Sequence, residues 1–426
     1  MTSRSLIALA VGVLAAAACG SDSDGTAGPD AIGVEPGSVD ASDWDAVLAE
    51  ADGQTVNWYM FGGSDAINQF VDTTYGPVLA DEFGITLNRV GVTDTVDAVN
   101  QVLAEQSAGE TSGAVDLIWI NGENFLSLKE ADMLFGGWAE SIPNSSLVDW
   151  ENPAVNRDFG EPVDEFESPW SSAQFQFVHD TARTATEDLP RSYAELATYA
   201  CDNPGRVTYI APGPGAFQGT RFVKGALFEL SGGAEQWADF DQALFDEWAT
   251  ELWEYLNELK PCLWRDGETY PKDEPELHAL FANGEVDFTI TQAAVGAGAL
   301  IADGLVPDTA DAFVFDDNMI GDFNYVTIPA NASNKAAALV LADLLLEPAS
   351  QAAHIDPDGG FGLGYGIDPN RVEDAAGREL LESGSASRGD AAADPDDLAN
   401  ALVGDGAGEY QELVENGWRT EIVGGL

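Results

Sequence analysis

"QTVNWYMFGGSDAINQFVDTTYGPVLADEFGITLNRVGV", residues 54–92, places a strand-like run, a helical pattern and a second strand-like run in direct succession. The first run, 54–61, ends at two glycines and a serine, and the helical pattern covers 65–83. Beyond the second strand at 85–92, a helix follows a cap at Asp94 or Thr95, and an apolar third strand spans 114–120. Strands that alternate with helices indicate a parallel sheet with right-handed crossovers, so we expect an α/β protein.

A second α/β block interrupts the first. Its expected elements are a strand at 206–212, helices at 219–232 and 245–260, and a strand at 284–292. Before this block, 168–180 is extended and aromatic, and after it 323–351 is typical of a strand, a proline turn and a helix. One block inserted into another predicts two lobes of ordinary domain size.

The N-terminus has the pattern of an export signal. Residues 6–18 are apolar but too few to span a bilayer, which needs about 20 residues. Arg4 precedes this run and small residues end it, as in a secretory signal peptide. Ala16-Ala17-Ala18-Cys19 resembles the bacterial lipobox, whose cysteine is diacylated, and two acyl chains anchor a protein stably.

We therefore expect a signal peptide with lipobox at 1–19, lipidation at Cys19, and an extracytoplasmic protein of the cell membrane, at the cell surface or in the periplasm. A plain signal peptide with an incidental cysteine is the alternative. Residues 20–42 are rich in Gly, Pro, Ser and Asp and are expected to form a flexible linker. A linker of this length reaches roughly 25 Å from the membrane.

The charge balance excludes some partners. The chain has 74 acidic and 17 basic residues, a formal net charge of −57, which repels nucleic acid and anionic lipid. Contact with the membrane is thus expected through the lipid anchor only. An acidic, halophilic type of surface, screened by salt, is the favoured explanation, and attraction of a cationic ligand is the alternative.

Catalytic and metal-binding patterns are missing from the sequence. His179, His278 and His354 are scattered without metal-ligand spacing, and the glycine-rich run 356–366 lacks the P-loop lysine and the EF-hand glutamate. We expect no catalytic residue, no metal and no cofactor. Cys201 and Cys262 favour a disulfide in an oxidising compartment, and two free buried thiols are the alternative.

Several segments, in this order, resemble a known family. The lipobox, the loop after the first expected strand, "WYMFGGSDAINQFV", and the segment "YVTIPANASNKAAALVLADLLLEPASQ" resemble ABC-transporter substrate-binding lipoproteins of the type II periplasmic-binding-protein fold. More narrowly, "DLIWINGENF", "PCLWRDGETYP" and "FANGEVDFTITQ" resemble the YnjB-like subfamily, described as thiamine-type binding proteins. The subfamily usually has an aromatic residue or Asp after its "YPAP" turn, and this chain has Gly213-Pro214-Gly215-Ala216 at that place.

The resemblance implies two lobes, hinge crossover strands near 168–176 and 321–328, and a ligand cleft between the lobes. We assign 43–170 plus 325–426 to lobe 1 and 171–324 to lobe 2. The implied function is capture of a small polar or cationic solute, thiamine-like or polyamine-like, by hinge closure, and its delivery to permease subunits. We expect a monomer.

Ligands of open α/β sheets lie beyond the carboxyl ends of the strands, where helix N-termini offer free N–H groups. Loops after the predicted strands supply most candidates, and the hinge supplies an aromatic wall suited to a cation. Thr291 and Gln292 face the cleft by the resemblance. The candidate ligand contacts are Phe61, Gly62, Gly63, Ser64, Asn121, Glu123, Asn124, Trp170, Gln174, Phe217, Gln218, Thr220, Thr291, Gln292 and Tyr325.

Two other functions remain open at this point. The bilobal fold also occurs in transferases such as porphobilinogen deaminase, which would need a nucleophile or base in the cleft. A binding protein for a sugar or another solute is the second alternative. We expect a binding protein and not an enzyme.

Overall fold

The computed structural model describes residues 39–213, 216–355, 360 and 362–424. The predicted signal peptide, Cys19 and most of the linker lie outside these residues, as do Pro214 and Gly215 of the segment that departs from the subfamily pattern. The helices are α1 Trp44–Ala51, α2 Asp65–Phe83, α3 Val96–Ser107, α4 Glu123–Glu130, α5 Tyr193–Asp202, α6 Phe217–Ser231, α7 Gln242–Leu259, α8 Glu274–Ala282, α9 Gly298–Ala302, α10 Lys335–Leu345, α11 Pro348–Ala353, α12 Ala375–Ser387, α13 Pro395–Ala401 and α14 Glu409–Glu421.

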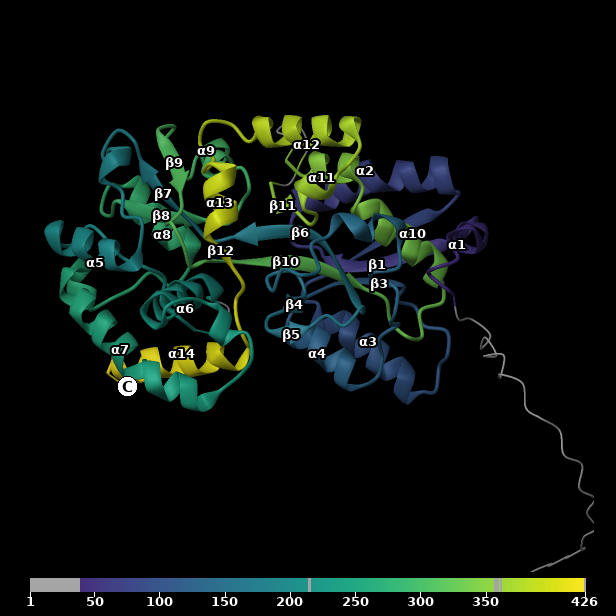
Figure 1. Cartoon of the computed structure of the whole chain (residues 1–426), viewed down its shortest axis with the longest axis horizontal. Coiled ribbons are helices and arrows are strands. Elements are labelled where there is room, and N and C mark those ends of the chain that lie inside the picture. The colour runs from purple at the N-terminus through teal and green to yellow at the C-terminus, as the bar shows by residue number, and fades with distance from the viewer. Residues whose placement is uncertain (1–38, 214–215, 356–359, 361, 425–426) are drawn as a thin grey trace, which may run out of the picture. The chain divides into compact units, whose positions relative to one another are not determined.

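Most strands belong to two sheets (Figure 1). The strands are β1 Thr55–Phe61, β2 Thr86–Val92, β3 Leu117–Ile120, β4 Arg157–Asp158, β5 Glu161–Pro162, β6 Glu167–Gln174, β7 Gln176–Asp180, β8 Phe288–Thr291, β9 Ala310–Phe313, β10 Met319–Thr327, β11 Gly364–Tyr365 and β12 Leu402–Val403. The larger sheet has the order β11-β6-β10-β3-β1-β2, with β12 pairing to β10, and the smaller has the order β8-β7-β9. β4 and β5 form a separate hairpin.

The opening stretch of sequence folds as predicted. β1 pairs in parallel with β2 and with β3, and α2 joins β1 to β2. Ser64 caps α2 by accepting from the Ile67 N–H, and Gly84 ends it in the left-handed conformation that glycine adopts without penalty. The parallel α/β half of the first lobe is therefore confirmed.

Each lobe has buried hydrophobic residues of its own. In lobe 1, one cluster lies between the larger sheet and helices such as α2 and α10, and another contains residues of β3, α3 and α4. The core of lobe 2 surrounds β7, β8 and β9. Strands β6 and β10 are antiparallel neighbours, and each continues from one lobe into the other, β6 directly into β7 and β10 directly from the segment after β9. These two strands are the hinge that the family resemblance implies.

The C-terminal segment differs from the sequence-based assignment, which placed 325–426 in lobe 1. α14 packs on α6 and α7 of lobe 2, where Tyr410, Val414 and Trp418 are buried in that lobe's core. These residues recur every four positions and form one apolar stripe. The stripe predicts a helix that must bury a face, but the sequence does not say which lobe supplies the partner surface.

The segment 206–212 also differs from the prediction, which made it a strand. Its residues Val207, Thr208, Tyr209 and Ile210 are buried, yet the segment belongs to neither sheet. Its backbone is instead bonded to scattered loop positions, for example from the Ala211 N–H to the Pro271 carbonyl. The apolar composition predicted burial correctly, whereas ladder pairing depends on neighbours distant in sequence.

A disulfide links Cys201 at the end of α5 to Cys262 after α7. Their Cα atoms are 4.8 Å apart, within the ordinary range for bonded cysteines. The bond closes 61 residues of sequence separation within lobe 2.

Candidate functional site

A cluster of buried charges lies where lobe 2 meets the hinge, and we call Arg221, Lys224, Gln292, Asp322 and Asp405 the junction cluster. Arg221 of α6 has its Nη2 2.7 Å from Asp322 Oδ2, and its Nη1 donates to Gln292 Oε1 at 3.0 Å. Its Nε donates to Asp405 Oδ2 at 3.4 Å. Lys224, one turn further along α6, donates to Asp405 Oδ1 at 2.6 Å. Since Asp322 belongs to β10, the cluster ties α6 to the hinge.

The two carboxylates of the junction cluster have opposite pKa shifts. Burial raises the pKa of Asp322 above its ordinary value, although the Arg221 guanidinium acts against that rise. Burial also acts to raise the pKa of Asp405, but Lys224 and Arg221 together hold this pKa below the ordinary value. The charge of Asp405 is therefore balanced by Lys224 and Arg221 within the junction cluster. Asp322 keeps one buried oxygen, Oδ1, that has no hydrogen-bond partner outside its own residue.

Asn121 and Gly122, the loop after β3, are fixed against the hinge and the β4–β5 hairpin. The Asn121 side chain donates to the Phe323 carbonyl at 2.7 Å, and the Gly122 N–H donates to Asp158 Oδ2 at 2.6 Å. Burial raises the pKa of Asp158 well above its ordinary value despite these hydrogen bonds. Asp158 is 1% exposed, so it accepts the hydrogen bond of the loop from the buried side.

The next two candidates lie in the first turn of α4. Glu123 is exposed and begins the helix, where a carboxylate is favoured by the helix dipole, and Asn124 is half-buried. On the lobe 2 side, Phe217 begins α6 and is 46% exposed. Its ring centroid lies 6.4 Å from that of Phe159, the residue at the tip of the β4–β5 hairpin. The two lobes therefore present aromatic rings to each other.

The loop after β1 contacts its own neighbours. Phe61 is 42% exposed, and Gly62 packs so closely on Gly91 of β2 that a Cβ there would lie 2.9 Å from the Gly91 Cα. Gly63 lies against the Phe61 ring, and Ser64 caps α2. A glycine is required at 62 for this close approach of two backbones, which is a structural reason for the sequence found there.

The candidates at the end of β8 divide into two roles. The Thr291 hydroxyl donates to the Gly296 carbonyl at 3.2 Å and so shapes its own turn. Gln292 belongs to the junction cluster, and its backbone carbonyl accepts from the N–H of Gln174 at 3.4 Å. The Gln174 side chain donates to the Leu398 carbonyl at 2.9 Å, which fastens the hinge to α13.

Two α6 candidates support the helix from within lobe 2. Gln218 is 8% exposed and lines the inside of the lobe, beside Tyr209 and Phe222. Thr220 donates to Glu415 of α14 at 3.0 Å. Both side chains therefore position α6, and the residues of this helix that reach toward the other lobe are Phe217 and Arg221.

The expected aromatic wall at the hinge is replaced by core packing. Trp170 is 0% exposed and lies edge-on to Trp58 and Trp119. Tyr325 is 1% exposed, and its hydroxyl donates to the Val155 carbonyl at 2.7 Å. Both rings are buried in the hydrophobic core of lobe 1, because a hinge strand that joins the larger sheet must bury one face.

Sequence reasoning missed Arg221, Asp322, Asp405, Asp158 and Phe159. One signal was present: Arg221 and Lys224 stand three positions apart inside an apolar helix, in a chain that has only 17 basic residues. Two cations on a buried helix face require carboxylate partners. Nothing local marks Asp322 or Asp405 as those partners among 74 acidic residues.

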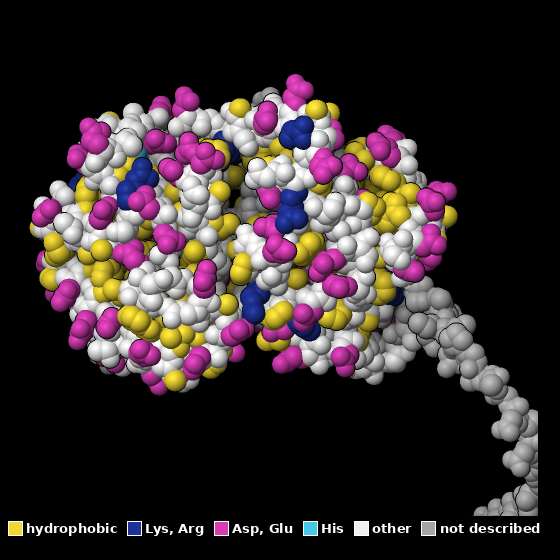
Figure 2. Space-filling model, in the orientation of Figure 1, with side chains coloured by type: hydrophobic (Ala, Val, Ile, Leu, Met, Phe, Trp, Pro, Cys, Tyr) yellow, Lys and Arg dark blue, Asp and Glu magenta, His cyan; other side chains and the backbone are white. Residues whose placement is uncertain are grey.

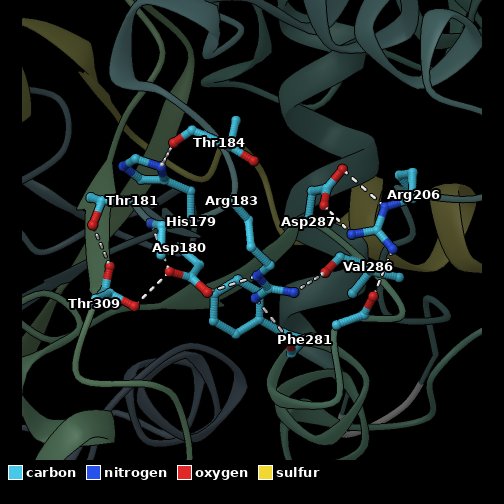
Figure 3. Close-up of polar contacts among 12 residues, drawn as sticks. His179, Asp180, Thr181, Arg183, Thr184, Arg206, Phe281, Val286, Asp287 and Thr309 are labelled. Carbon is cyan, nitrogen blue, oxygen red and sulfur yellow. Dashed lines mark hydrogen bonds and ion pairs between the residues drawn. The ribbon is translucent and has the colours of Figure 1, made fainter.

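A pocket of about 780 Å³ lies at the opposite end of the smaller sheet, next to the C-terminal end of β7. Figure 3 shows its polar neighbourhood, in which Arg183 binds Asp180 and Arg206 binds Asp287. The Arg183 Nη2 atom also donates to the Phe281 carbonyl at 3.0 Å. Both guanidinium groups are engaged within the protein, so these contacts hold together the outer end of lobe 2.

Acidic side chains are spread over the whole visible face of the molecule in Figure 2, and basic ones are few. The same view shows the surface hollowed between the elements of the two lobes. Among the helices of the described ranges, none combines the length and the apolar character needed to cross a bilayer. Within those ranges, no group of three or more His, Cys, Asp or Glu side chains is placed to hold a metal ion.

The model of the family "Bacterial extracellular solute-binding protein" matches residues 79–364, which is more than half of the chain. The chain belongs to this family. Protein YnjB of Escherichia coli (strain K12) is 39% identical over 345 residues, which cover 80% of this chain and 87% of YnjB. The family consists of solute-binding proteins and not of enzymes.

Solved structures of other solute-binding proteins share the fold. FutA of Trichodesmium, in complex with iron and citrate, gives a TM-score of 0.56 at 13% identity and covers 86% of this chain and 99% of its own. The spermidine/putrescine substrate-binding protein PotD of Streptococcus pneumoniae gives 0.54 at 13% identity, with 86% and 98% covered. The two-lobe type II periplasmic-binding-protein fold of this solute-binding protein is thereby confirmed.

Proposed function

We propose that this solute-binding protein is the extracytoplasmic receptor of an ABC importer, that Cys19 anchors it to the membrane by lipid, and that it captures a small organic cation by closing its lobes. Membership of the family supports capture of a small solute. A receptor outside the membrane must be retained near its permease, and a lipid anchor with a linker does so.

The charge state of the junction cluster carries the choice of a cation. The Arg221 guanidinium is occupied by Asp322, Asp405 and Gln292, so it has little capacity left for an anionic solute. Asp322, in contrast, keeps its Oδ1 atom for a further donor. Burial raises the pKa of Asp322 and so disfavours its ionised form. A positive charge that approaches this carboxylate stabilises the ionised form.

The ligands named for the structural neighbours differ in charge. FutA was solved with iron and citrate, and PotD is described as a spermidine/putrescine binder. At 13% identity these proteins share the fold only. The thiamine-type character of the YnjB-like subfamily is a further reason to test organic cations first.

Isothermal titration calorimetry and thermal unfolding with thiamine, spermidine, citrate and glucose test the proposal. We expect an organic cation to bind and to stabilise the folded state by about 2.7 kcal/mol at one hundred times Kd. The variant Asp322→Asn should bind that cation at least about tenfold more weakly, a change of roughly 1.4 kcal/mol. Asp316→Asn, at an exposed position before β10, is the matched control and should bind like the parent protein. Binding of citrate or glucose alone would contradict the choice of a cation.

A further inference from the structure

The tip of the β4–β5 hairpin has an unusual backbone. Phe159 has φ 47° and the following Gly160 has φ 86°. Glycine adopts a positive φ freely, whereas a bulky residue rarely does. The conformation of Phe159 is therefore imposed by its surroundings, which is the pattern found at ligand clamps.

Contacts from both lobes impose the backbone conformation of Phe159. On the lobe 1 side, the Tyr325 hydroxyl donates to the Arg157 carbonyl at 3.2 Å, and the buried Asp158 holds the Gly122 N–H. On the lobe 2 side, Arg157 pairs with Asp239 at 2.9 Å. Arg157 also donates to the Gly160 carbonyl at 2.8 Å, which closes the tip. The ring of Phe159 is thus fixed on a tip that spans the junction of the lobes.

The ring of Phe159 lies near two features of the site. A Cβ on Gly122 would come within 3.3 Å of this ring, so the ring covers the loop that follows β3. The same ring is a neighbour of Phe217, at 6.4 Å between centroids and 65° between ring planes. Phe217 is 46% exposed, which is a large apolar area to leave in water at the first residue of a buried helix.

We propose that Phe159 and Phe217 are the two walls of an aromatic clamp that receives a flat cationic ring, and this rests on the proposed function. The rings come from different lobes, so a hinge motion that also breaks the Arg157–Asp239 pair changes the distance between them. Stacked rings need centroid separations of about 4.5 Å or more, so parting the pair by about 3 Å admits a third ring. In the present structure the two phenylalanines contact each other and fill that place.

Charge and shape together select the solute. Phe217 and Arg221 stand four positions apart on α6, so Phe217 lies on the same helix face as the Arg221–Asp322 pair. A cation gains from the faces of both rings and from the carboxylate. A flexible polyamine offers ammonium groups without a plane, so it gains from the carboxylate but little from two opposed walls.

Calorimetry with thiamine, a flat cation, and spermidine, a cation without a ring, tests the clamp. Phe159→Leu and Phe217→Leu should each weaken thiamine binding by about 2- to 30-fold and leave spermidine binding unchanged. Phe83→Leu is the matched control, because Phe83 is the last residue of α2 and packs on the core of lobe 1. Phe159→Gly removes the ring and also permits the positive φ, so it separates lost binding from lost folding.

Equal affinities of the parent protein and both leucine variants for thiamine would overturn the clamp. An equal loss of spermidine affinity in these variants would overturn it too, because the flat ring would then not be what the clamp recognises. If the parent protein binds spermidine but not thiamine, the clamp is refuted and the proposed function stands. If it binds neither and takes only citrate or glucose, the proposed function itself fails.

Discussion

Replacing Asp405 by asparagine removes one of the two carboxylates that neutralise α6. Lys224 is 1% exposed, and Asp405 Oδ1 accepts its hydrogen bond at 2.6 Å. Arg221 is 5% exposed and keeps Asp322 and Gln292 as partners after the substitution. The change therefore leaves the Lys224 ammonium group buried without a countercharge at hydrogen-bond distance.

Breaking a buried ion pair by removing one partner costs about 3–5 kcal/mol. For a lobe of roughly 200 residues, each kcal/mol lowers Tm by about 2–4 °C. We therefore expect Asp405→Asn to lower the unfolding temperature of lobe 2 by roughly 10 °C, measured by calorimetry at neutral pH. The same decrease should persist at high salt, because buried pairs are screened much less than exposed ones.

Two further variants make the test specific. Lys224→Met combined with Asp405→Leu removes both charges and should recover most of the lost Tm, since apolar replacement of a buried pair is often neutral. Asp308→Asn, at an exposed position of the same lobe, should change Tm little. A single Asp405→Asn variant as stable as the parent protein, or a double variant as unstable as the single one, would refute the reasoning.

Three other predictions concern stability and pH. Replacing Cys201 and Cys262 by serine should lower the unfolding free energy by about 4 kcal/mol in urea titrations, as the chain-entropy model gives for a 61-residue separation, and a loss below about 1 kcal/mol would contradict it. Burial raises the pKa of Asp343 to about 6, although Asn144 donates hydrogen bonds to this carboxyl group. The folded state therefore binds the carboxyl proton more tightly than the unfolded state does. The resulting stabilisation of the folded state is present near pH 4 and is lost as pH rises through 6. Asp343→Asn should therefore be more stable than the parent protein at pH 7.5, by up to about 3 kcal/mol, and equal near pH 4 in thermal melts. Because burial raises the pKa of Asp322, organic-cation affinity should rise with pH above 4 with release of a proton, seen by calorimetry in two buffers; a flat profile in the parent protein would exclude a role for this carboxyl.

Much of the fold could be predicted because its signals are local. The strand, helix and strand of 54–92 appear at β1, α2 and β2, and the extended run 168–180 became β6 and β7. Apolar periodicity and capping residues act within a few positions, so one sequence window contains them. The candidate site was predicted only at the level of loops: Phe217 and Gln292 lie at the junction of the lobes, whereas Trp170 and Tyr325 are in the core.

The sequence by itself determined the α/β class, the two lobes, the resemblance to solute-binding proteins and the strongly acidic surface. Only the tertiary structure decided that α14 covers lobe 2, that Asp322 and Asp405 are the carboxylates that neutralise α6, and that Phe159 faces Phe217. The physical reason is distance along the chain. Arg221 and Asp405 are 184 positions apart, and many acidic side chains could serve as its partner until packing brings one within hydrogen-bond range.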